Sequence, residues 1–229
     1  MDDSGIAYYR IEYQYDDGHT FSGGPYRTTT ISERNHVPGI WEEGGVKFRV
    51  RAIDNAGNEG EWSEWRHYYY ISSKPVVSLI SPYDNFITNQ SFTQNWNVDT
   101  FHANHIDHYE YRSCQNNPTT DGTCNVLFED KTLTSNSRTV EKQDDKIFWW
   151  QVRAVDKAGN IGEWTIARKV TLDSTAPATT LTSDPSGTYI NTPVSISGQS
   201  IDTNGIDSVN IFYRVTGATD WTSITTLDN

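Results

Sequence analysis

Apolar and polar residues alternate in three stretches of the chain, which begin at Ile6, Ile106 and Ile206 after a polar turn. In the first stretch, the aromatic and β-branched residues of segment 9–13 share one parity, and charged or amide residues occupy the other. A period of two with one apolar side is typical of a strand that buries one face. The third stretch alternates less regularly, because Phe212 falls on the outward parity. The pattern predicts three related strands at intervals of 100 residues.

A thirteen-residue segment, Val50–Trp62, returns as Val152–Trp164 with ten identical positions. Each copy begins as an alternating strand and continues as Asp-x-Ala-Gly-Asn, where Asp can bond its own backbone and Gly or Asn tolerates positive φ. We therefore expect a strand and a turn, followed by returning strands over Glu61–Ile71 and Glu163–Leu172. The offset of 102 residues is too long for a solenoid repeat and suits one small β-sandwich.

Proline-bearing links divide the chain. The first link, Ser72–Pro75, and the second link, Asp173–Pro177, each precede an apolar run, and their prolines are again 102 residues apart. The links predict three units, residues 1–73, 74–174 and 175–229. Short, stiff links favour an extended string of units over loosely tethered ones.

The repeated strand and turn, the Pro-led boundaries, and Trp96 within the run Phe92–Val98 together resemble bacterial fibronectin type III domains. The third unit, with Val194–Gly198 and Asp202–Ile206, is more similar to bacterial Ig-like repeats of large surface proteins. The resemblance implies an all-β fold of tandem fibronectin III/Ig-like β-sandwiches. It covers nearly the whole chain and says little about a ligand.

The chain departs from the family pattern in two ways. Phe48 and Trp150 stand where the family often has a corner Tyr, and neither carries the phenolic hydroxyl of that corner. On a seven-strand plan the first unit begins at its third strand, and the last unit ends soon after Trp221. A sandwich without two or three strands cannot close its core. We therefore expect a window of a longer repeat protein, or half-domains that complement one another between copies by strand donation.

Outward-facing arginines and tryptophans are expected to meet on the surface of the first two units as a cation–π ladder. The predicted residues are Arg49, Arg51, Trp62, Trp65, Arg153 and Trp164. Each contact would contribute about 0.5–2 kcal/mol and stiffen the sheet surface. The sequence around the first two tryptophans resembles the Trp-Ser box of cytokine-receptor fibronectin domains. A carbohydrate-stacking platform is the alternative interpretation.

Cys114 and Cys124 are the only cysteines, and nine residues lie between them. They occur where the strand Tyr109–Ser113 leaves the sheet and the chain doubles back. We predict a disulfide that closes this loop, stabilises the fold by roughly 2–3 kcal/mol and indicates an oxidising compartment. Free thiols are the alternative, because zinc needs more ligands than this pair supplies.

His102, His105 and His108 recur at every third position. In an extended chain this spacing sends neighbouring side chains to different sides, so we expect a solvated loop rather than a metal site. The acidic pairs Glu42–Glu43 and Asp144–Asp145 precede strands, and we interpret them as solvated turn charges.

No cofactor is expected, although calcium remains open for an acidic chain. Asp156, Asp173 and Asp202 could offer oxygen ligands in or near the links, but no EF-hand loop is present.

Composition and charge narrow the function. The chain has 229 residues, 13% of them aromatic, and a formal net charge of −12, which argues against a nucleic-acid partner. No apolar run approaches the roughly 18 residues of a transmembrane helix, and the N-terminus lacks the regions of a signal peptide. No nucleophile elbow, phosphate-binding Gly loop or His-Glu-x-x-His motif occurs, so we expect no enzyme.

These observations favour a non-catalytic structural or adhesive repeat region of an extracellular or cell-surface protein, and the resemblance implies a bacterial one. Its expected partners are neighbouring repeats of the same polypeptide, with other surface proteins or glycans left open. Accessory or carbohydrate-binding modules of a secreted hydrolase are the alternative.

Overall fold

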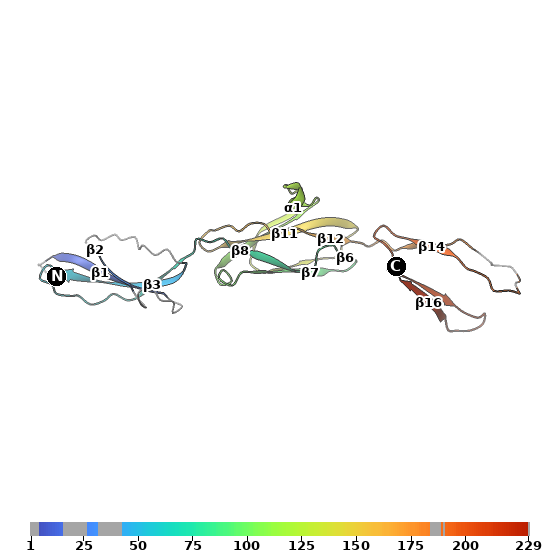
Figure 1. Ribbon diagram of the computed structural model, residues 1–229, viewed down its shortest axis with the longest axis horizontal. Coiled ribbons are helices and arrows are strands. Elements are labelled where there is room, and N and C mark those ends of the chain that lie inside the picture. Colours follow the sequence, from blue (N-terminus) through green and yellow to red (C-terminus); the bar gives the residue numbers. More distant parts are fainter. Residues whose placement is uncertain (1–4, 16–26, 32–42, 184–188, 190, 229) are drawn as a thin grey trace.

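The computed structural model describes residues 5–15, 27–31, 43–183, 189 and 191–228. Strands make up nearly all of its regular structure, which confirms the prediction of an all-β protein. Three groups of strands follow one another along the long axis of the molecule (Figure 1).

The first group is one four-stranded antiparallel sheet, the N-terminal sheet, with strand order β2-β1-β3-β4. Its strands are β1 (Ile6–Tyr15), β2 (Arg27–Ile31), β3 (Gly44–Asp54) and β4 (Arg66–Tyr70). The alternation of β1 places Ile11 and Tyr13 on the buried side, where they pack in one cluster with Val46 of β3. The predicted first strand therefore buries the face that its sequence pattern indicates.

The second group, the middle sandwich, consists of two facing sheets with strand orders β10-β7-β5 and β6-β12-β11-β8-β9. The strands are β5 (Val77–Ser81), β6 (Phe86–Thr88), β7 (Phe92–Val98), β8 (Ile106–Cys114), β9 (Val126–Leu133), β10 (Ser137–Val140), β11 (Lys146–Asp156) and β12 (Arg168–Leu172). Trp96 of β7 and Trp150 of β11 are fully buried, and their ring centroids lie 6.5 Å apart. One core therefore joins both sheets, as expected of a β-sandwich.

The third group consists of two separate hairpins, the C-terminal hairpins, which diverge in Figure 1. Strand β13 (Ala178–Leu181) pairs with β14 (Gly198–Ile201), and β15 (Ser208–Tyr213) pairs with β16 (Thr222–Asp228). Among the residues described here, large apolar side chains stay exposed, including Trp221 at 61%. None of the side chains described in these hairpins belongs to a buried core cluster.

The returning strands β4 and β12 each begin five residues later than the sequence predicts. Before β4, the amide of Ser63 donates to the Val50 carbonyl at 2.8 Å, and the Ser63 hydroxyl accepts from the Val50 amide at 3.1 Å. Before β12, Thr165 makes the same two bonds with Val152. In each case a side-chain hydroxyl takes the place of the backbone carbonyl that would accept this hydrogen bond between paired strands. Regular strand pairing therefore begins only after this residue.

Candidate functional site

The Asp-x-Ala-Gly-Asn turn is closed by its own aspartate. Asp54 accepts hydrogen bonds from the amides of Ala56 and Asn58 at 2.9 and 2.7 Å and from the Asn58 side chain at 2.7 Å. Gly57 takes a φ of 90°, which requires glycine. The second turn repeats the three bonds at Asp156, each at 2.9 Å. Both segments are therefore scaffolds whose carboxylates are engaged within the turn.

The expectation of a solvated loop is wrong for His102, whose exposed fraction is only 3%. Its Nδ1 lies 2.7 Å from Asp99 Oδ1, and its Nε2 lies 3.3 Å from the carbonyl and hydroxyl oxygens of Ser73 and 3.9 Å from Asp156 Oδ2. The loop is not extended, because the His105 amide donates back to the His102 carbonyl at 2.8 Å. The extended-chain spacing rule therefore does not apply to this loop, and the His102 imidazole reaches the first link.

Three residues of the second repeated segment also contact the first link or the residue just before it. The Asn160 side chain donates to the Ile71 carbonyl at 3.1 Å, and Glu163 pairs with Lys74 at 2.8 Å. Gly162 is buried, and a β-carbon there would collide with the carbonyl oxygen of the link proline. The turn that closes β11 therefore fixes the chain that enters the middle sandwich.

Glu43, expected only as a solvated turn charge, binds the first link from the other side. Its carboxylate accepts hydrogen bonds from the amides and hydroxyls of Ser72 and Ser73. Burial by itself would raise the pKa of Glu43, but these bonds outweigh it and lower the pKa to about 2. Its neighbour Glu42 lies outside the described residues.

Asp145, 102 positions later, does the same for the second link. It accepts from the Ser174 amide and hydroxyl at 2.6 and 2.8 Å and from the Thr175 hydroxyl. The bond from the Thr175 hydroxyl, followed by those from Ser174, lowers the pKa of Asp145 to about 2. Asp144 and Asp145 are exposed, as interpreted from the sequence, but Asp145 also binds a link.

The cations and indoles of the N-terminal sheet are interleaved. Arg49 lies 4.7 Å from the ring centroids of both Trp62 and Trp65, Arg51 lies 4.6 Å from Trp62, and Lys47 lies 5.4 Å from Trp65. Lys47 was not anticipated, although it shares the parity of the two arginines on β3. Each indole therefore contacts two cations, which favours the predicted ladder over a sugar-stacking platform.

In the middle sandwich a shorter ladder forms around Trp164, between Arg153 at 4.7 Å and Arg112 at 4.1 Å. Arg112 was not predicted from the sequence, although its position in the alternating pattern places it on the outward face of β8, the strand next to β11. Gln151 stands opposite it, and the Gln151 side-chain oxygen accepts two bonds from its guanidinium at 3.0 and 2.8 Å. The ladder is therefore extended by the neighbouring strand rather than by a second indole.

Ion pairs accompany each ladder. In the N-terminal sheet, Arg10 and Arg51 stand opposite each other on β1 and β3, and Glu59 binds them at 2.8 and 2.6 Å. In the middle sandwich, Glu110 stands opposite Arg153 and binds it directly at 2.5 Å.

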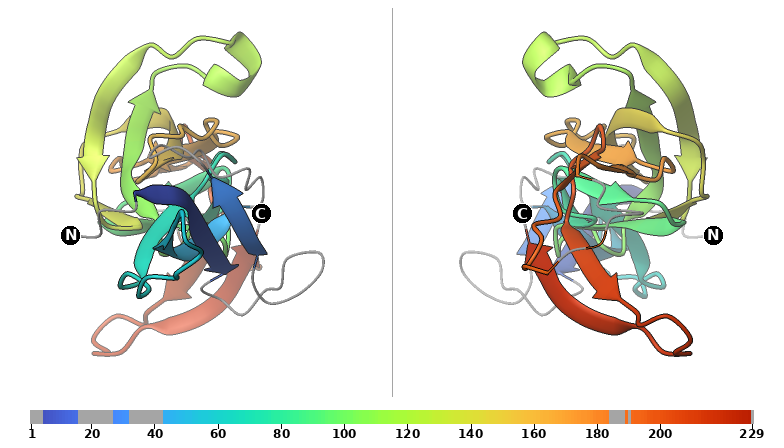
Figure 2. Two further views of the ribbon diagram at one scale, coloured as in Figure 1. Left: turned by 90° about the vertical axis from the view of Figure 1, so that its left-hand side faces the viewer. Right: turned by 90° about the vertical axis from the view of Figure 1, so that its right-hand side faces the viewer.

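A disulfide joins Cys114 and Cys124, whose Cα atoms lie 5.3 Å apart. The loop between them contains the short helix α1 (Pro118–Asp121) and projects from the side of the middle sandwich (Figure 2). The Thr119 hydroxyl in α1 accepts from the Ala167 amide at 2.8 Å, so the loop is attached to the segment before β12.

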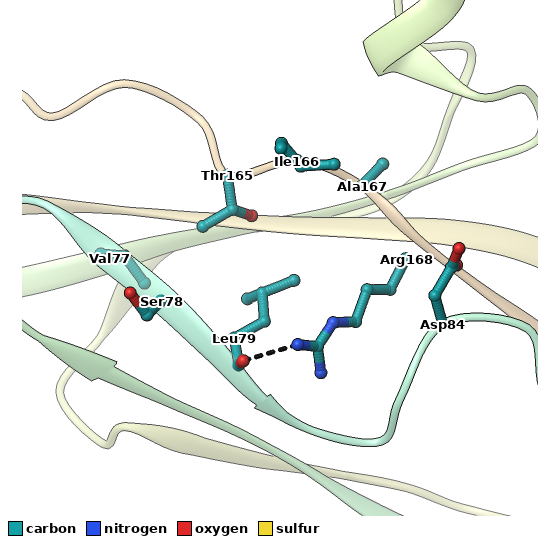
Figure 3. Close-up of a pocket in the computed structure, with 8 residues that line it drawn as sticks. All are labelled: Val77, Ser78, Leu79, Asp84, Thr165, Ile166, Ala167 and Arg168. Atoms are coloured by element: carbon teal, nitrogen blue, oxygen red, sulfur yellow. Dashed lines mark hydrogen bonds between the residues drawn. The ribbon is translucent and has the colours of Figure 1, made fainter.

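An open groove of about 440 Å³ lies between the edge strand β5 and the segment that leads into β12 (Figure 3). The Arg168 guanidinium crosses it and donates to the carbonyls of Leu79, Ile80 and Pro82 at 2.7, 3.0 and 2.5 Å. Asp84, on the rim, accepts from the amide that follows Arg168 at 2.7 Å. The charged groups of the groove are therefore bound to backbone, and outward carbonyls of the edge strand are already paired.

Within the described ranges, no three His, Cys, Asp or Glu side chains gather to hold a metal ion. The acids considered for calcium, Asp156, Asp173 and Asp202, each accept backbone amides of their own turns. The part of the chain that the structure describes contains no helix with the length and apolarity needed to cross a membrane.

No protein-family model matches the chain, and no curated protein does either. Among solved structures, it is similar to the fibronectin(III)-like modules of Clostridium thermocellum CbhA, with 14% identity and a TM-score of 0.32, over 76% of this chain and 81% of that one. It is also similar to the FN1–FN3 domains of chicken CNTN1, with 13% identity and a TM-score of 0.30, over 73% of this chain and 56% of that one. Scores this low do not assign a family.

Proposed function

We propose that the chain is a non-catalytic structural or adhesive repeat region of an extracellular or cell-surface protein, in which the units act as a stiff spacer. The units would be residues 1–73, 74–174 and 175–229. The observation that carries the proposal is the first junction, where a buried imidazole, an acid and a turn all bind the first link. A link held from several sides transmits orientation, which a loosely tethered one does not.

The junction contacts come from both sides of the link. Glu43, which directly precedes β3 of the N-terminal sheet, binds it from one side, and His102 and Asn160 of the middle unit bind it or its preceding residue. The rings of Tyr69 and His105 lie 5.0 Å apart across the junction. Bending here would therefore break hydrogen bonds and a ring contact together.

The extracellular location is supported by the disulfide, because such bonds persist in oxidising compartments. The non-catalytic character is supported by the groove beside β5, since its charged side chains are bound to backbone. The ladder supports stiffening in preference to glycan stacking, since the indole faces meet cations.

Pulsed electron spin resonance tests the spacer role. Spin labels on a ketone-bearing amino acid at the exposed positions Glu64 and Lys131 would report the distance between the first two groups while sparing the disulfide. We expect a narrow distance distribution, a broader one in Gly162→Val, where a side chain would collide with the link, and no change in the matched control Gly60→Val. A broad distribution in the unmodified chain would refute a stiff spacer.

A further inference from the structure

Three residues of the second repeated segment contact the first link or the residue just before it, and all three recur in the first segment. Asn160, Gly162 and Glu163 have identical residues 102 positions earlier. These first-segment residues are Asn58, Gly60 and Glu61. The residue between the asparagine and the glycine differs: it is Glu59 in the first segment and Ile161 in the second.

The backbone of the first segment already has the shape that binds a link. The Gly60 amide donates to the Ala52 carbonyl at 2.9 Å, as the Gly162 amide does to Ala154 at 2.9 Å. The Asn58 carbonyl accepts from the Asp54 amide at 3.1 Å, and the same bond at 3.1 Å closes the second turn. No rearrangement is needed for this surface to receive a segment like the first link.

The turn alone does not explain these residues. Asn58 is accounted for in part by its bonds to Asp54, but Gly60 has no left-handed φ. A β-carbon at Gly60 would come no closer than 3.4 Å to another group, whereas at Gly162 it would strike the link. Gly60 and Glu61 are exposed, while Gly162 is buried beneath the link. The first surface thus has the residues of a contact that the described chain does not make there.

We propose that Asn58, Gly60 and Glu61 form a docking surface for the strand-exit segment of another unit of this kind, placed ahead of residue 1 in the same polypeptide. The segment would be extended, with a carbonyl bound by the Asn58 amide group, a lysine paired with Glu61 and a proline carbonyl lying over Gly60. The second link has Ala176 where the first has Lys74, so the surface favours a segment of the first kind. The docking proposal does not require the chain to act as a stiff spacer.

The test adds a copy of residues 69–76 to the full chain, through a flexible Gly/Ser tether ahead of Met1. The tether supplies a high effective concentration for a contact that is weak between separate molecules. In ¹⁵N NMR spectra we expect shifts of the Asn58 side-chain amide and the Gly60 amide, and slower hydrogen exchange at Gly60. A scrambled segment on the same tether is the control.

Two variants make the test specific. Gly60→Val should abolish the shifts, since its side chain takes the place of the proline carbonyl. Replacing the lysine of the added segment by glutamate should reduce the bound fraction about two- to fivefold, and Glu61→Lys should restore it, as expected for an exposed ion pair. The charge exchange keeps the test valid if the valine variant folds poorly.

Equal spectra for the native and scrambled segments would overturn the proposal. So would self-association of the unmodified chain in sedimentation that is lost in Gly60→Val, because the surface would then belong to a second copy. Neither result alters the distance measurement at the first junction, so this proposal and the spacer role can fail separately.

Discussion

Across β1 and β3 of the N-terminal sheet, Arg10 faces Arg51 and both bind Glu59, whereas in the middle sandwich Glu110 faces Arg153 and binds it directly. Two like charges opposite each other in a sheet are destabilising, so the first arrangement needs its third residue. The arrangement in the middle sandwich needs no third residue, and the position that corresponds to Glu59 is occupied by Ile161, which is 44% exposed. Two positions have changed together, Arg10 to Glu110 and Glu59 to Ile161, while the arginine at 51 and 153 is kept, and the charge is compensated in both surfaces.

The neighbouring pair of facing residues also differs between the two surfaces. Glu12 binds Arg49 at 2.6 Å on the N-terminal sheet, whereas Arg112 binds Gln151 on the middle sandwich. The position of Glu12 is occupied by Arg112, and the position of Arg49 by Gln151. What the two surfaces share is an outward layer in which every guanidinium has an oxygen partner or an indole, rather than any fixed residue.

The largest effect is expected from Glu110→Arg, which creates two facing arginines in the middle sandwich without a bridging acid. Glu110 is buried, so we expect a loss of about 2–4 kcal/mol of unfolding free energy. Urea denaturation followed by the fluorescence of the buried tryptophans measures it. Adding Ile161→Glu, which copies the N-terminal arrangement, should recover part of the loss. Failure of that rescue would contradict the comparison.

A smaller effect is expected from Glu59→Ile in the N-terminal sheet. The change leaves Arg10 and Arg51 opposed on a more exposed surface, at a cost of about 0.5–1 kcal/mol. Arg10→Glu should recover most of this loss in the Glu59→Ile background, because it re-creates the facing Glu–Arg pair of the middle sandwich, and should be unfavourable alone, because the new acid would lie near Glu59. Hydrogen exchange of the β1 and β3 amides gives the four free energies of the cycle, and additive changes would count against coupling.

The smallest expected effect is a weakening of the attachment of the first link at low pH. The pKa of Glu43 is about 2 in the folded chain, against an ordinary 4.5. A carboxyl whose folded pKa is depressed stabilises fully above its unfolded pKa and loses this as pH falls through the folded pKa. We therefore expect attachment of the first link to weaken only between pH 4.5 and about 2. The Ser73 amide shift should titrate near pH 2 and become flat in Glu43→Gln, and a midpoint near 4 would be inconsistent with these bonds.

The sequence predicted the strands well where local pattern decides them. The alternation after Ile6 and Ile106 marks β1 and β8, because a half-buried strand needs only its own period of two. The Asp-x-Ala-Gly-Asn turns were equally accessible, since their bonds run within five residues. For the hairpins after residue 175, the pattern marks strands but not which of their faces are covered.

The contacts with the links were harder to predict. The burial of His102 depends on a turn and on Ser73, which is 29 residues away, and no spacing rule contains either. The roles of Glu43 and Asp145 had a usable signal, because each acid recurs at the same offset as a pair of hydroxyl residues in the link. Lys47 and Arg112 needed the register of adjacent strands, which parity alone does not supply.

The disulfide bears on how the chain would behave under tension. Pulling on both ends of the middle sandwich would extend its chain only after the sheets separate. Cys114 and Cys124 are separated by 10 positions and held 5.3 Å apart, so the loop between them carries no load. At about 3.4 Å per extended residue, roughly 30 Å of contour length is withheld. Single-molecule stretching would therefore give a shorter extension step for the oxidised chain than for the reduced one, while α1 stays outside the path of the force.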